Sequence, residues 1–138
     1  MSFTDVKPSI AIEGVEESTV IDYFATINQE KFESTAALFA EGGELLAPFE
    51  KPIVGQKAIA SYLAKEAKGM ELRPKSASYE PIENNSRAIK IVGKVKTPLF
   101  SVNVGWYFKL NQSQEITSVK IKLLASPQEL LGLRNIKG

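Results

Sequence analysis

The chain has 138 residues, 43% of them hydrophobic, which suits one domain built around one core. Seventeen basic and sixteen acidic side chains leave a net charge of +1, so the overall charge does not favour nucleic acid. The absence of cysteine and histidine excludes disulfides and thiolate nucleophiles, and it removes the commonest general base and metal ligand. We therefore predict a single domain over residues 1–138 with no metal site and no catalytic residue.

The first thirteen residues show little periodicity, and we expect them to form an arm with a short extended piece near Ile10 and Ile12. They lack the basic start and apolar run of a secretory signal. No stretch of the chain approaches the roughly 20 apolar residues of a membrane span. The sequence thus predicts a soluble cytoplasmic protein.

Three helices are predicted after the arm. The first has apolar residues at helical spacing from Val20 to Ile27, with Ser18 or Thr19 as its N-cap. A second is expected over 32–39 and ended by Gly42-Gly43, followed by a brief strand over 45–49 and an extended Ile53-Val54. The third is expected over 56–68, with a glycine behind it as a stop.

Alternating apolar and polar residues predict four long strands over 70–79, 87–97, 100–110 and 115–124. Polar breaks between them indicate hairpins, hence antiparallel neighbours. A short closing helix is expected from Ser126 to Leu133. Helices followed by a long curved antiparallel sheet predict an α+β domain, in an order similar to the cone-shaped nuclear transport factor 2-like (NTF2-like) fold, in which helices leave an apolar pocket.

The alternation also assigns the two faces of the sheet. The face expected to turn toward the helices includes Phe100, Val102, Val104, Trp106, Phe108 and Leu110. The opposite face is expected to hold Lys90, Lys94, Lys96, Lys120 and Lys122. The inner face then has no carboxylate, and two neutral donors remain on apolar faces, the Tyr23 hydroxyl and the Trp106 indole N–H. Both could meet inside the cone and bind an oxygen of an apolar ligand.

Three alternatives stay open on these residues alone. Tyr23 and Trp106 could be ordinary core aromatics whose polar atoms bond a backbone carbonyl. An enzyme similar to ketosteroid isomerase would use them as an oxyanion hole, but neither Asp5 in the arm nor Asp22 beside the apolar stripe is a plausible base. The lysine face could dock a protein partner, although such lysines commonly serve solubility.

Several short segments stand out in the chain: Glu13-Gly14-Val15, Pro48-Phe49-Glu50, Thr97-Pro98 and, most specific of all, Leu123-Leu124-Ala125-Ser126-Pro127-Gln128-Glu129-Leu130-Leu131. Together they resemble the C-terminal domain of the orange carotenoid protein family, over about residues 10–134. The segments match only the C-terminal domain of that family and not its helical N-terminal domain, so we expect a protein similar to the family's stand-alone C-terminal domain homologues. One departure is Leu99, where the family often has tryptophan.

The resemblance implies a ketocarotenoid ligand, such as canthaxanthin, echinenone or 3′-hydroxyechinenone. Its keto oxygen would be held by Tyr23 and Trp106. The contacts to ring and polyene that the resemblance implies are Ile27, Leu72, Pro98, Phe100, Val104 and Ile121. Two neutral donors would satisfy the oxygen without burying a charge.

The implied function is that of a carrier and not an enzyme. It would collect ketocarotenoid through transient membrane contact and pass it to a helical carotenoid protein, with photoprotection and singlet-oxygen quenching secondary. A single domain would leave half of the polyene in water, so we expect the loaded form to be a two-fold homodimer sharing one pigment. Glu66 matches an acidic residue that pairs with the other domain in the family and is a candidate interface residue; it could equally be a solvated helix edge.

Overall fold

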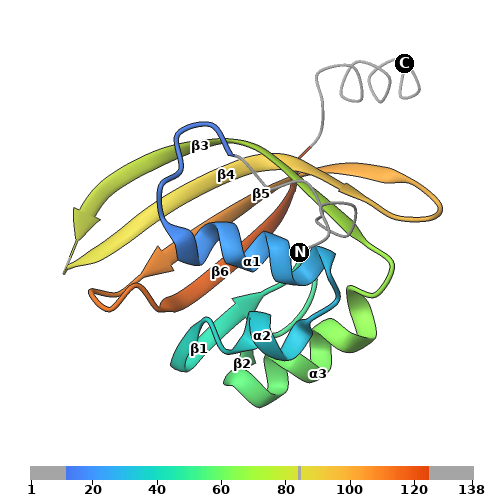
Figure 1. The fold of residues 1–138 in the computed structure, drawn as a ribbon, viewed down its shortest axis with the longest axis horizontal. Helices are drawn as coiled ribbons and strands as arrows, with labels where there is room; N and C mark the ends of the chain where they lie inside the picture. Colours follow the sequence, from blue (N-terminus) through green and yellow to red (C-terminus); the bar gives the residue numbers. More distant parts are fainter. Residues whose placement is uncertain (1–11, 84, 125–138) are drawn as a thin grey trace, which may run out of the picture.

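One curved six-stranded sheet with three helices on one face makes up the part of the chain that the computed structural model describes, residues 12–83 and 85–124 (Figure 1). The α+β, NTF2-like architecture expected from the sequence is confirmed. The elements in chain order are α1 Ser18–Asn28, α2 Phe32–Ala36, β1 Phe39–Leu46, β2 Ile53–Val54, α3 Gln56–Glu66, β3 Glu71–Glu83, β4 Ser86–Lys96, β5 Ser101–Leu110 and β6 Ile116–Leu124.

The strands lie in the order β2-β1-β6-β5-β4-β3. β3 to β6 form the predicted antiparallel meander, in which Trp106 of β5 lies between Ile91 of β4 and Ile121 of β6. One pair departs from the antiparallel sheet expected, because β1 runs parallel to β6. The chain passes through β2, α3 and the strands β3 to β5 before it returns beside β1 as β6, and its direction on return could not be inferred from the local pattern.

The segment between α2 and β1 differs most from the prediction. The second helix was expected to reach Phe39, but α2 ends at Ala36 and β1 already begins at Phe39. Gly42 and Gly43 lie within the strand, where the register against β6 shifts. A Cβ at Gly43 would lie 2.7 Å from the carbonyl oxygen of Ile116, so the glycine permits a close approach of β1 to β6 and does not end a helix.

The N-cap predicted for the first helix is wrong. Glu17 occupies the N-cap position of α1 without a side-chain capping bond. The Thr19 hydroxyl instead donates to the carbonyl oxygen of Gln114, 2.8 Å away, in the β5–β6 turn. A tertiary hydrogen bond has therefore replaced the local one. In the arm, Glu13 forms an isolated bridge with Ser76, while residues 1–11 and the expected closing helix over 126–133 lie outside the described residues.

The core lies between the helices and the inner face of the sheet. Val104, Trp106, Phe108 and Leu110 are buried there as predicted. Phe100 is an exception, because it precedes β5 in a turn and is 58% exposed. No helix among the described residues is long and apolar enough to cross a membrane.

Candidate ligand site

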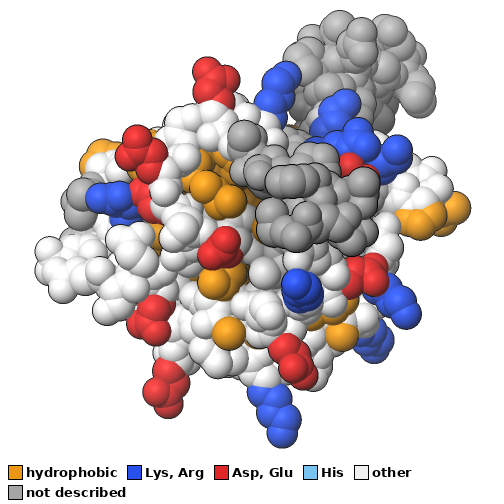
Figure 2. All heavy atoms as spheres, viewed as in Figure 1, with side chains coloured by type: hydrophobic (Ala, Val, Ile, Leu, Met, Phe, Trp, Pro, Cys, Tyr) orange, Lys and Arg blue, Asp and Glu red, His pale blue; other side chains and the backbone are white. Residues whose placement is uncertain are grey.

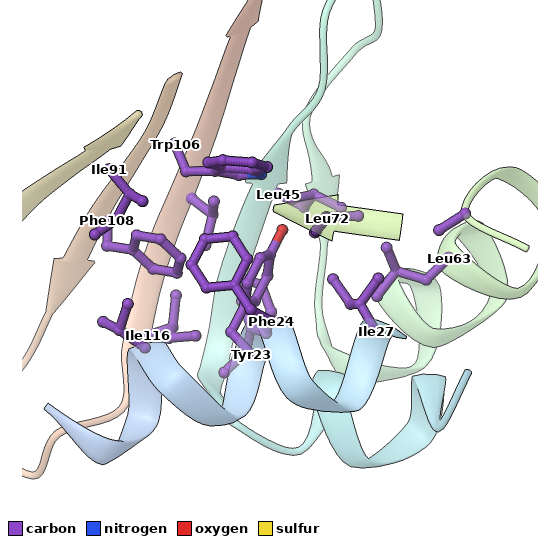
Figure 3. Close-up of a cluster of buried hydrophobic side chains, with 14 of the residues drawn as sticks. Tyr23, Phe24, Ile27, Leu45, Leu63, Leu72, Ile91, Trp106, Phe108 and Ile116 are labelled. Atoms are coloured by element: carbon purple, nitrogen blue, oxygen red, sulfur yellow. The ribbon is translucent and has the colours of Figure 1, made fainter. Parts of the chain in front are cut away.

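Four aromatic rings from α1 and β5 pack together at the centre of the core (Figure 3). Phe24 makes edge-to-face contacts with both Tyr23 and Trp106, at ring-centroid distances of 5.2 and 4.8 Å. Phe108 packs against Tyr23 in the same manner at 5.0 Å. Tyr23 and Phe24 of α1 therefore pack against Phe108 and Trp106 of β5. Phe24 contacts both candidate donors and so holds their rings in place.

The polar atoms of Tyr23 and Trp106 lie at the same end of this cluster. In Figure 3 the phenolic oxygen and the indole nitrogen both point to the side on which Leu45 and Leu72 lie. Both side chains are only 1% exposed. Among the hydrogen bonds between described residues, none involves the Tyr23 hydroxyl or the Trp106 N–H. A bond from either donor to a backbone carbonyl is not seen among the described residues, and that alternative stays a prediction.

Burial raises the pKa of the Tyr23 phenol above its ordinary value, and the nearby Tyr62 phenol acts in the same direction. A phenol with a raised pKa stays protonated at neutral pH, so Tyr23 can donate a hydrogen bond. The Trp106 N–H is a donor at any physiological pH. The arrangement can bind a neutral oxygen acceptor in apolar surroundings.

The other residues predicted to contact the ligand fall into two groups. Ile27, Leu72 and Val104 are buried in the core cluster, and Ile121 lies half-buried beside Trp106 across the β5–β6 ladder. The remaining two, Pro98 and Phe100, are exposed in the β4–β5 turn, away from the aromatic cluster. The structure thus brings together six of the eight predicted residues and leaves the other two at the edge of the sheet.

A groove with a volume of about 540 Å³ opens next to Ile121. One wall is the β1–β2 turn and the other is the end of β6. Its lining residues are Leu46, Ala47, Pro48, Phe49, Glu50, Pro52, Lys120, Ile121, Lys122 and Leu123. Because Ile121 is the cross-strand neighbour of Trp106, the groove reaches the strand pair that holds the indole.

Glu66 lies exposed at the end of α3. Burial raises the pKa of the Tyr62 phenol on the same helix, and the carboxylates of Glu50 and Glu66 raise it further. Two carboxylates from α3 and the β1–β2 turn therefore act on one phenol beside the groove. This is an acidic cluster that the sequence pattern did not bring together.

A buried carboxylate was missed by the sequence analysis. Glu17 is 7% exposed and accepts hydrogen bonds from the Tyr79 hydroxyl at 2.6 Å and from the Arg87 guanidinium. Burial alone would raise the pKa of Glu17, but these two donors outweigh it and hold the pKa below its ordinary value. Its only signal in the sequence is the Glu16-Glu17 pair before α1, and acidic residues are common at the start of a helix for electrostatic reasons.

Glu17 does not supply the base that an isomerase would need. Arg87 lies four residues along β4 from Ile91, the cross-strand partner of Trp106, which is roughly 13 Å in a strand. A carboxylate with a lowered pKa, ion-paired to a guanidinium, is also a weak proton acceptor. Within the described residues, no group of three or more carboxylates could hold a metal ion.

The lysines predicted on the outer face do share that face. The register pairs Lys90 of β4 directly with Tyr107, and Lys122 of β6, which is paired with Gly105, reaches the same ring diagonally; the ammonium-to-centroid distances are 5.5 and 5.1 Å. Contacts of this kind stabilise a pair by about 0.5–1 kcal/mol at exposed sites. Whether the face also docks a partner stays a prediction.

Comparison with known proteins points to one group. The chain is 42% identical over 131 residues to the orange carotenoid-binding protein of Limnospira maxima, covering 92% of this chain and 41% of that protein. It superimposes on the structure of the Anabaena (Nostoc) sp. PCC 7120 orange carotenoid protein binding canthaxanthin with a TM-score of 0.84 and 37% identity, covering 96% of this chain and 43% of the other. No protein-family model matches.

A more distant structure supports the fold alone. An NTF2-like protein of unknown function from Cytophaga hutchinsonii is 15% identical with a TM-score of 0.61, and the match covers 86% of this chain and 98% of that one. The chain therefore has the size of a whole NTF2-like domain but spans less than half the length of the carotenoid proteins it matches.

Proposed function

We propose that this chain, which is homologous to a domain-sized part of the orange carotenoid proteins, binds a ketocarotenoid by the keto oxygen of one terminal ring. The observation that supports this most directly is the common orientation of two buried neutral donors, Tyr23 and Trp106, at one end of an apolar cluster. A homologue binds canthaxanthin, which has such an oxygen.

The proposal accounts for both the polarity and the burial of the site. The keto oxygen can accept a hydrogen bond from each donor, and a net contribution of about 0.5–1.5 kcal/mol per hydrogen bond is typical. The ring adds apolar burial at about 25 cal/mol per Å². Ile27, Leu72 and Val104 contact the ring, while Ile121, Pro98 and Phe100 follow the polyene toward the edge of the sheet. Canthaxanthin, echinenone and 3′-hydroxyechinenone all present the required group.

Binding requires the core to open, because the rings of Tyr23, Phe24 and Trp106 are packed against one another. The groove beside Ile121 is the route by which the ring enters. Displacing the side chains that close it costs free energy, which the buried ring and polyene offset.

The biological role we propose is carriage of pigment. A loaded protein forms a two-fold homodimer in which each copy holds one ring, so that the middle of the polyene is covered. It then transfers the pigment to a helical carotenoid protein, with the acidic cluster of Glu50 and Glu66 as a contact for a cationic group on that partner. Photoprotection by quenching singlet oxygen is a secondary consequence of holding the pigment.

Production of the protein in cells that make canthaxanthin tests the proposal. The purified wild type should be coloured and dimeric by size-exclusion chromatography with light scattering. Tyr23→Phe and Trp106→Phe should each shift the visible absorption or reduce the retained pigment, because each removes one hydrogen bond to the keto oxygen.

Tyr107→Phe is the matched control, since Tyr107 lies one residue from Trp106 on the outer face of β5. It should leave colour and spectrum unchanged. A colourless wild type would instead favour the isomerase or protein-docking alternatives. Identical spectra for wild type and both donor variants would refute the two-donor site while leaving pigment binding intact.

A further inference from the structure

Exposed hydrophobic side chains are concentrated at one end of the sheet. The strands β1, β4 and β6 end at this end of the sheet, and the strands β3 and β5, which run in the opposite direction, begin at it. We call this end the open edge. Four large hydrophobic residues at the open edge are half or more exposed, and we refer to them as the rim: Phe49 at 96%, Leu99 at 89%, Phe100 at 58% and Leu123 at 51%.

Two of the rim residues are held outward by a fixed turn. The Thr97 hydroxyl oxygen accepts hydrogen bonds from the backbone N–H groups of Leu99 and Phe100, at 3.2 and 3.0 Å. The Thr97 N–H in turn donates to the Phe100 carbonyl oxygen at 2.8 Å. A turn closed in this way keeps its apolar side chains at the tip and exposed to solvent. Figure 2 shows hydrophobic side chains at this tip, at the right of the view.

Phe49 is exposed despite an unfavourable backbone conformation. Its φ of +64° lies in the left-handed region, which bulky residues rarely adopt and which asparagine or glycine would occupy at lower cost. At 96% exposure its ring makes little contact within the protein that could repay this cost. A strained, exposed aromatic residue of this kind points to a role in binding.

Lysines lie beside the rim on both sides of the groove. Lys51 follows in the same turn as Phe49, and Lys120 and Lys122 line the groove with a single carboxylate, Glu50, opposite them. Lys96 ends β4 directly before the Thr97 turn. Apolar side chains on projecting tips with lysines behind them match the boundary of a bilayer, where the tips enter the acyl region and the ammonium groups meet anionic headgroups.

We propose that the open edge docks the pigment-free protein onto an anionic lipid bilayer, with Phe49 and Leu99 inserted and Lys51 and Lys96 on the headgroups. This inference rests on the proposed function, because docking here brings the groove, and through it Trp106, to the surface in which carotenoids dissolve. Pigment loading and membrane docking then use the same edge. In the pigment-bound dimer the second copy covers this edge, so the dimer binds vesicles more weakly than the pigment-free protein.

The test is sedimentation of the pigment-free full chain with vesicles of phosphatidylcholine, with and without phosphatidylglycerol. We expect binding to the anionic vesicles that weakens with salt. The double variant Phe49→Ser/Leu99→Ser should lower the partition coefficient at least tenfold. Lys51→Gln and Lys96→Gln should each lower it about fivefold.

Matched controls change residues of the same kind elsewhere. Val54→Ser removes a 54%-exposed hydrophobic side chain in β2, and Lys109→Gln removes an exposed lysine near the other end of β5. Both should bind as the wild type does, and urea midpoints should show that all variants are folded. Absence of wild-type binding to anionic vesicles would overturn the inference.

Two further outcomes separate the inference from its alternatives. Rim variants that bind vesicles normally but no longer dimerise would assign the rim to contact between copies and overturn membrane docking. Vesicle binding that persists in a protein that retains no pigment on co-expression would refute the proposed function while leaving the docking surface supported, because the vesicle assay contains no carotenoid.

Discussion

The buried ion pair of Glu17 with Arg87 leads to a prediction that needs no ligand. Glu17→Gln preserves the shape of the side chain but removes the charge that two donors share. The Glu17 side chain is 5% exposed, and it accepts from Tyr79 as well as from Arg87. Each hydrogen bond to a charged group contributes about 1.5–3 kcal/mol. Both donors sit on roughly half-exposed side chains that can rehydrate, so we expect the free energy of unfolding to fall by about 2–3 kcal/mol at neutral pH.

The dependence on pH distinguishes charge from packing. The pKa of Glu17 is lower in the folded protein than its ordinary value of 4.5. Its contribution to stability is therefore fully present above pH 4.5 and is lost as the pH falls through the folded-state pKa. The difference between wild type and Glu17→Gln should be largest near pH 7. It should shrink below pH 4.5, first because the carboxylate of the unfolded chain is protonated and then because the folded carboxylate is protonated at its lower pKa.

Urea unfolding followed by the fluorescence of the single tryptophan, buried at position 106, measures both quantities. The control is Glu71→Gln, which breaks a surface pair with Arg73 in which both side chains are more than half exposed. Such pairs contribute little, and we expect no measurable change. A loss for Glu17→Gln that is equal at pH 7 and pH 3.5 would show that packing, and not charge, is responsible and would refute the reasoning.

Four further substitutions test the core and the close contacts of the backbone. Phe24→Ala should lower the free energy of unfolding by about 3–5 kcal/mol and abolish pigment retention, because both donor rings pack against Phe24; unfolding and pigment content measure the two effects. Asn28→Ala removes a side chain that bonds both the N–H and the carbonyl oxygen of Leu72, at 2.7 and 2.9 Å, and should cost about 1–3 kcal/mol with faster hydrogen exchange at that N–H. Gly93→Ala places a Cβ 2.2 Å from a carbonyl oxygen of β3 and should destabilise strongly. Gly105→Ala meets side-chain atoms of Tyr107 and Leu124, none closer than 3.2 Å, and should be tolerated; thermal unfolding compares the two variants.

Strand positions were predictable because side-chain alternation is a local property. The four long strands begin and end within a few residues of their predicted bounds, except that β3 extends to Glu83. The inward position of Trp106 followed from the same alternation, since its neighbours two residues away are also apolar. Helical spacing gave Tyr23 and Phe24 of α1 their buried positions in the same way.

Other features depend on contacts between distant segments, and only the tertiary structure decided them. Glu17 precedes Tyr79 by 62 residues and Arg87 by 70, so no local pattern could identify their pairing. The parallel contact of β1 with β6 changed Gly43 from an expected helix stop into a point of close strand approach. The rim likewise exists because β1, β4 and β6 end at the same edge of the sheet. The sequence alone determined which faces are apolar and which neutral donors are available, because periodicity acts over neighbouring residues; the fold determined which of those residues meet, because that depends on strand order and direction.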